Sequence, residues 1–155
     1  MQLEFYRINA SGKFFCRQGI DQRRGLKLTE AMELEAEISQ NRTLIASCGS
    51  GGVVVAEKTF TQSFLIAPDG TLADWEVGEF SALSPARLEQ LCLVDSDVLM
   101  IGTGVSQCFP DAGLTQMLAK HGRSAEFMSS RTACTTFNVL ALDDRQVMAA
   151  IILPL

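Results

Sequence analysis

The chain has 155 residues, 47% of them hydrophobic, so it is long enough for one domain with a sizeable core. Its formal net charge of −5, from 13 basic and 18 acidic residues, argues against non-specific binding to nucleic acid. No apolar run approaches the roughly 20 residues of a transmembrane helix.

The N-terminus and the cysteines indicate a compartment. The first four residues show no basic segment followed by an apolar one, so we expect no secretory signal. Five widely spaced cysteines without a C-x-x-C pair, together with a single histidine, His121, favour reduced thiols over a disulfide framework or a zinc site. These features predict a cytoplasmic protein, which we expect to be bacterial, with no metal site and no cofactor.

Residues 1–40 differ from the rest and are predicted to form an N-terminal extension to a domain over 41–155. Leu3, Phe5 and Phe14-Phe15 flank a turn-like stretch at 9–12, which indicates a weak hairpin. Thr29 is a candidate cap for a helix over 30–38, although this helix has only a thin apolar stripe.

The next part of the chain is rich in strand patterns. Strands are predicted over 43–47, 53–56, 60–67 and 71–75, and together they indicate an antiparallel meander. The glycine cluster at 49–52 fits either a phosphate cradle or a hairpin turn. The turn is favoured because no helix begins after the glycines to supply anion-binding amides.

From Ser84 onward, helices and strands alternate. Ser84 with Pro85 predicts one helix start, and a second helix is expected from 110 or 111 to 121. Ser129 or Ser130 is expected to cap a third helix that runs to Leu140. Strands are predicted over 97–102, 124–128 and 147–153, the second of them parallel to the first. This order is typical of a layered α/β domain.

The strand over 97–102 ends in a candidate ligand-binding loop. Ligands of open α/β sheets usually bind at the carboxyl ends of parallel strands. Gly102 and Gly104 would let backbone amides approach a ligand, and Thr103, Ser106 and Gln107 would add hydrogen bonds. The dinucleotide fingerprint is incomplete because position 107 is glutamine, so a purely structural loop is the favoured alternative.

The third predicted helix carries two further candidates. Cys134 lies near the start of the helix, where the helix dipole would lower its pKa, and His121 could act as its base. The alternative, a small buried hydrophobic residue beside Phe137, is favoured. Asn138 would need hydrogen-bond partners if buried, and we expect it to bind the backbone of the Gly102-Thr103-Gly104 loop or a ligand there.

The pattern from about Leu44 onward resembles the Mth-domain family, a small α/β family of unknown biochemical function. The resemblance covers about three quarters of the chain and rests on the following segments: Phe60-Thr61-Gln62-Ser63-Phe64-Leu65-Ile66, Pro68-Asp69-Gly70, Trp75, Leu99-Met100-Ile101-Gly102-Thr103-Gly104 with Gln107 and Phe109-Pro110, Glu126-Phe127-Met128, and Thr132-Ala133-Cys134-Thr135-Thr136-Phe137-Asn138-Val139-Leu140. It implies a three-layer fold with a mixed central sheet flanked by helices and a small antiparallel section.

Three features depart from the family pattern. Residues 1–40 have no counterpart, Thr135 stands where arginine is frequent, and Phe137 stands where tyrosine is frequent. The chain therefore lacks an anion-binding or phenolic side chain at those two positions.

The resemblance also suggests a function, because eukaryotic members include a mitochondrial assembly factor for respiratory complex I and an adipogenesis-associated protein. The leading hypothesis is a non-enzymatic protein-binding or assembly-type factor with partners in respiratory complex assembly. The alternative is a binder of a small anionic or nucleotide-like ligand at 102–107, with thiol chemistry at Cys134. The candidate ligand-binding residues are Gly102, Thr103, Gly104, Gln107, Cys134 and Asn138.

Overall fold

The computed structural model describes residues 7–8, 14–15 and 42–155, and the chain divides into two units, 1–40 and 41–155. In the first unit, β1 (Arg7–Ile8) pairs with β2 (Phe14–Phe15) in antiparallel fashion, as the predicted hairpin requires, and the predicted turn at 9–12 lies outside the described residues. The helix predicted over 30–38 lies outside the described residues.

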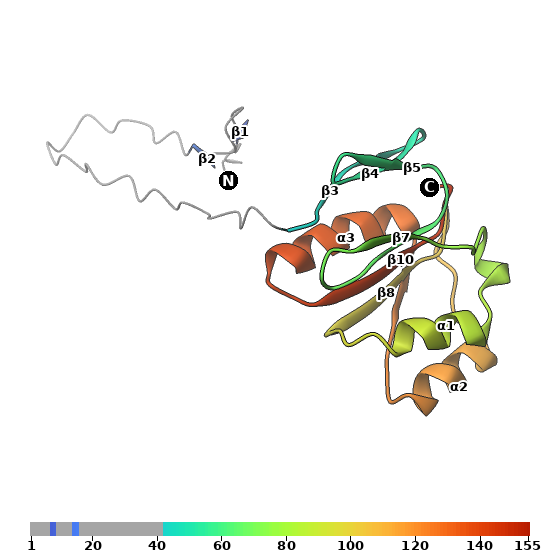
Figure 1. Cartoon of the computed structure of the whole chain (residues 1–155). Coiled ribbons are helices and arrows are strands. Elements are labelled where there is room, and N and C mark those ends of the chain that lie inside the picture. Colours follow the sequence, from blue (N-terminus) through green and yellow to red (C-terminus); the bar gives the residue numbers. More distant parts are fainter. Residues whose placement is uncertain (1–6, 9–13, 16–41) are drawn as a thin grey trace, which may run out of the picture. The chain divides into compact units, whose positions relative to one another are not determined.

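The centre of the second unit is a five-stranded mixed sheet in the order β7-β6-β10-β8-β9 (Figure 1). The parallel strands are β8 (Val98–Gly102), β9 (Glu126–Met128) and β10 (Val147–Ile151). β6 (Phe64–Ile66) pairs antiparallel with β10, and β7 (Leu72–Asp74) returns beside β6. The predicted mixed sheet and its parallel crossover are confirmed.

A second, antiparallel sheet contains β3 (Ile45–Gly49), β4 (Gly52–Val55) and β5 (Lys58–Phe60). The prediction of a single strand over 60–67 within one meander is wrong, because the chain bends at Thr61 and Gln62 and β5 and β6 belong to different sheets. The bend places Phe60 and Phe64 face to face, with ring centroids 4.3 Å apart. Stacking of these two buried rings joins the two sheets.

Three α-helices and one short 3-10 helix complete the unit: η1 (Phe80–Ala82), α1 (Pro85–Cys92), α2 (Ala112–Lys120) and α3 (Ser130–Leu142). Side-chain oxygens of Ser84, Asp111 and Ser129 accept hydrogen bonds from the first turns of α1, α2 and α3. The predicted caps of α1 and α3 are confirmed, and the cap of α2, Asp111, lies at the predicted start of that helix.

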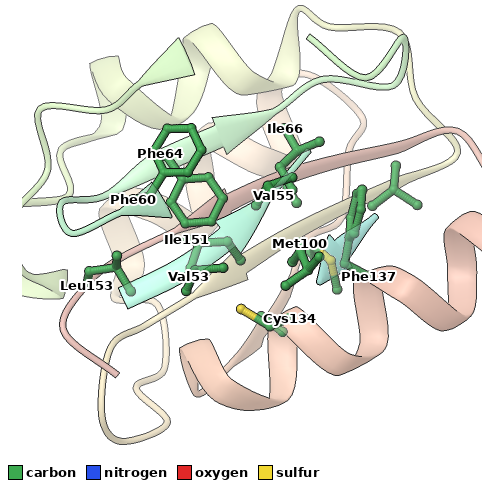
Figure 2. Packing of buried hydrophobic residues seen from close by; sticks show 14 residues of the cluster. Val53, Val55, Phe60, Phe64, Ile66, Met100, Cys134, Phe137, Ile151 and Leu153 are labelled. Atoms are coloured by element: carbon green, nitrogen blue, oxygen red, sulfur yellow. The ribbon is translucent and has the colours of Figure 1, made fainter. Parts of the chain in front are cut away.

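The central sheet separates two hydrophobic clusters, which gives the three layers. On one face, α3 and the small sheet cover Met100, Ala149 and Ile151. Figure 2 shows this cluster, with Cys134 and Phe137 projecting from α3. On the other face, α1 and α2 cover Leu99 and Met148. Within the described part of the chain, no helix is long and apolar enough to cross a membrane.

Candidate functional site

Thr103 organises the loop that follows β8. Its side-chain oxygen lies 2.6 Å from the carbonyl oxygen of Ser106 and 3.1 Å from that of Met128, and it accepts a hydrogen bond from the amide of Cys108 at 3.0 Å. The residue is only 5% exposed. One buried hydroxyl therefore fixes both ends of the loop, and this demand for a buried hydrogen-bonding side chain explains threonine at position 103.

Ser130, in the first turn of α3, holds the loop from the other side. Its hydroxyl donates to the carbonyl oxygen of Ile152 at 2.5 Å and accepts from the amide of Gly104 at 2.8 Å. Its own amide donates to the carbonyl oxygen of Gly104 at 2.8 Å. Sequence reasoning considered Ser130 only as a helix cap, whereas this fully buried residue joins the loop, α3 and the end of β10.

The structure favours glycine at positions 102 and 104 for two different reasons. A Cβ atom at Gly102 would lie 2.8 Å from the Oγ atom and 2.9 Å from the Cα atom of Ser130, so α3 approaches β8 closely only because residue 102 has no side chain. Gly104 adopts a φ of +97°, which L-residues rarely adopt.

The loop bonds several of its polar groups internally and exposes two apolar side chains. The side-chain amide of Gln107 donates to the carbonyl oxygen of Phe127 at 3.0 Å. Val105 and Phe109 are 69% and 76% exposed. A backbone held by internal hydrogen bonds that exposes large apolar side chains has the chemistry of a protein contact surface.

Cys134 lies in an environment that suppresses its reactivity. It is 1% exposed, and burial, with a smaller contribution from the neighbouring Cys48 thiol, raises its pKa to about 12. The expectation that the helix dipole lowers this pKa is wrong, because loss of hydration outweighs the dipole.

His121 does not face Cys134. Its Nε2 atom lies 3.0 Å from the Oε1 atom of Glu89, and this contact, followed by the charge of Lys120, lowers the pKa of Glu89. Helix α2, which ends beside His121, covers the opposite face of the central sheet from α3 (Figure 1). The less favoured hypothesis, a thiol–histidine pair of Cys134 and His121, is therefore wrong, and Cys134 lies buried beside Phe137 as the favoured alternative predicted.

Asn138 has a partner that sequence reasoning did not find. Its amide group bonds to both backbone groups of Ile45, accepting from the nitrogen and donating to the oxygen, each at 2.8 Å. The expected bond to the Gly102-Thr103-Gly104 loop is absent among the described contacts, because the side chain faces β3. The six candidate residues thus occupy two places, the loop and the face of α3 beside β3.

A cavity of about 180 Å³ lies near the start of β10, at the opposite end of the parallel strands from the loop. Arg42, Asp69, Arg145 and Gln146 line its rim, and Phe137 and Val147 lie among its apolar lining residues. Arg42 forms an ion pair with Asp144 and donates to the carbonyl oxygen of Ala141 at 2.7 Å. No sequence pattern predicts this cavity, because its lining residues come from three separate stretches of the chain.

The fold and the glycine loop define the class: a three-layer α/β domain with a mixed central sheet and a glycine loop at the carboxyl end of β8. The chain belongs to the family described as "Protein of unknown function (DUF498/DUF598)", whose model matches residues 45–152. This match and a solved Mth938-like domain that resembles the chain together confirm the resemblance to the Mth-domain family.

Solved structures agree with the family match. A crystal structure of a Bordetella parapertussis protein has a TM-score of 0.67 and 26% identity, covering 72% of this chain and 96% of that one. A solution structure of an Mth938-like domain from Bordetella pertussis has a TM-score of 0.64 at 23% identity, covering 78% and 92%, and supports the fold.

Two curated relatives carry names. A "13 kDa major membrane protein" of Francisella tularensis is 31% identical over 50% of this chain and 63% of that protein. The "NADH dehydrogenase (ubiquinone) 1 alpha subcomplex assembly factor 3" of Danio rerio is 31% identical over 72% of this chain and 65% of that protein. The chain thus matches slightly less than two thirds of the length of each.

Proposed function

We propose that this protein is a non-enzymatic protein-binding factor in the assembly of a respiratory NADH dehydrogenase. The observation that carries the proposal is the loop after β8, which exposes Val105 and Phe109 by 69% and 76%. The name of the zebrafish relative, an assembly factor for NADH dehydrogenase, supplies the class of partner.

The loop has the physical properties that a docking surface needs. Side-chain hydrogen bonds of Thr103, Gln107 and Ser130, the last accepting from the amide of Gly104, hold the loop, so little conformational entropy is lost when a partner binds. Large apolar side chains in the centre of an interface contribute most of its binding free energy. The expected partner surface is an apolar pocket on an NADH dehydrogenase subunit or assembly intermediate, reached from the cytoplasmic side.

The alternative, binding of a small anionic or nucleotide-like ligand at 102–107, stays a prediction with less support. The amides of Thr103, Gly104 and Cys108 already donate to internal acceptors, which reduces the number of donors left for an anion. The burial of Cys134 and its raised pKa argue against thiol chemistry at this residue.

The test is affinity purification of the full chain from detergent-solubilised cells, comparing wild type with Phe109→Ser. Leu93→Ser is the matched control, because Leu93 is 72% exposed at the end of α1, away from the loop. We expect NADH dehydrogenase subunits with wild type and with Leu93→Ser. Recovery with Phe109→Ser should fall about tenfold or more, as for loss of an interface hot spot.

Each other outcome has a definite meaning. Equal recovery with Phe109→Ser would remove the loop as the docking surface. Absence of respiratory subunits from the wild-type eluate would contradict the assembly role, and a retained metabolite in its place would favour the ligand-binding alternative. Cell fractionation of the same strain tests the cytoplasmic location.

A further inference from the structure

The pairing register of β3 turns Cys48 toward the core. Cys48 lies opposite Val53, and Ile45 lies opposite Val55; both valines are 0% exposed. Residues three apart in a regular strand face opposite sides, but an irregularity between Ile45 and Ser47 shifts the register. Because cross-strand partners share a face, Cys48 and Ile45 both project toward the buried side.

Helix α3 runs antiparallel to the strand that contains Cys48. Arg42 bonds to Ala141 near the end of α3, and Ile45 bonds to Asn138 one turn earlier. From Ile45 to Cys48, β3 advances by the length of two residues of β4, from Val55 to Val53, which is about 7 Å. Over a similar distance, about 6 Å, α3 runs back by one turn from Asn138 to Cys134.

Cys48 and Cys134 therefore meet at the same level of the β3–α3 interface. Cys48 packs against the cluster that contains Cys134, and its thiol is among the groups that raise the pKa of Cys134. Cys134 is 1% exposed and projects from α3 into the layer that contains Val53 (Figure 2). Cys48 is half-buried, so it is the more accessible of the two thiols.

We propose that Cys48 and Cys134 form a redox-active pair that closes to a disulfide between β3 and α3 in the presence of a low-molecular-weight disulfide. This inference is independent of the proposed docking loop. Intracellular disulfides of this kind are usually transient and redox-sensing.

The chemistry follows the different exposure of the two sulfurs. The Cys48 thiolate attacks one sulfur of the small disulfide, forming a mixed disulfide and releasing one small thiolate. The Cys134 sulfur then loses its proton, attacks the Cys48 sulfur and releases the second small thiolate. The two protein thiols lose two electrons and two protons, and the small disulfide becomes two small thiols. Proximity raises the effective concentration of Cys134 and offsets its low thiolate fraction.

The test is peptide mapping of the full chain after incubation with oxidised glutathione at pH 8, with free thiols blocked before digestion. Trypsin separates the cysteines clearly: Cys48 lies in peptide 43–58, Cys134 in 132–145, Cys16 in 14–17, and Cys92 with Cys108 in 88–120. We expect peptides 43–58 and 132–145 to become linked, with a mass lower by two hydrogens than the sum of the free peptides. Dithiothreitol should separate them.

Two variants distinguish the roles of the sulfurs. Cys48→Ser should abolish the link and leave Cys134 free, whereas Cys134→Ser should leave a stable glutathione adduct on Cys48. Circular dichroism checks that each variant is folded. The peptide map of the wild-type chain tests the disulfide even if a variant does not fold. The proposal is overturned if wild-type Cys48 and Cys134 both stay free, if Cys48 keeps the glutathione adduct in wild type, or if either sulfur links to Cys16, Cys92 or Cys108 instead.

Discussion

Asn138 holds Ile45 as a neighbouring strand would: its amide group bonds to the nitrogen and the oxygen of the same residue, both at 2.8 Å. The two residues are separated by 93 positions in the chain. Only asparagine or glutamine offers a donor and an acceptor in one side-chain group that matches a peptide unit in this way. The amide therefore joins the small sheet to α3.

Replacing Asn138 by Ala is expected to destabilise the protein by about 1–3 kcal/mol, because two partly buried backbone groups of Ile45 lose their partners. Urea unfolding followed by circular dichroism measures the loss. Val139→Ala is the control, since Val139 is the next residue of α3 and is 62% exposed. The control should change stability by no more than about 0.5 kcal/mol. Equal stability of the two variants would show that water replaces the side chain.

Gly102→Ala is expected to cost about 1–3 kcal/mol, as in other overpacked sites. The new methyl group would lie 2.9 Å from the Cα atom of Ser130, so the backbone of α3 must move. Gly49→Ala serves as the control, because a Cβ atom there meets nothing within 4 Å. Thermal unfolding compares the two. The tight approach of α3 to β8 is refuted if both variants melt at the same temperature.

The elements that could be predicted from sequence are those with local causes. Ser84, Asp111 and Ser129 cap their helices through hydrogen bonds to amides three residues away, so short-range patterns identify them. β5 was missed because its turn uses Ala56 and Glu57 at positive φ, 46° and 67°, where glycine or asparagine is the usual signal.

The candidate site was only partly predictable for the same reason. Gly102, Thr103 and Gly104 were found from the end of an apolar strand, but their internal partner Ser130 comes from a helix 26 residues beyond Gly104. The partner of Asn138 and the cavity beside Arg42 depend on pairings between distant segments, and one sequence carries no local signal for these.

Cys134 is expected to resist iodoacetamide at pH 7 in the folded protein, because it is 1% exposed and burial keeps it protonated. Peptide 132–145 should be modified only after unfolding in urea. Cys108, which is half-buried on the loop, provides the internal comparison and should react first. Rapid modification of Cys134 in the folded chain would contradict this prediction and make Cys134 a candidate nucleophile.

Stability is expected to fall steeply at alkaline pH because of the same thiol. Burial raises the pKa of Cys134 to about 12 in the folded chain, whereas an unfolded cysteine ionises near pH ~8.5. The unfolded state therefore releases this proton first. The stabilising contribution of the protonated thiol is complete below about pH 8.5 and is lost as pH rises toward 12.

Urea unfolding at pH 8, 9, 10 and 11 tests this linkage by comparing wild type with Cys134→Ala. Between pH 9 and 11, wild type should lose about 2.5 kcal/mol more than the variant, since each pH unit costs up to about 1.4 kcal/mol per proton and the unfolded thiol is only partly protonated at pH 9. The other titratable side chains are common to both proteins, so their contributions cancel in the difference. Parallel curves for the two proteins would mean that Cys134 ionises as easily in the folded chain as in the unfolded one.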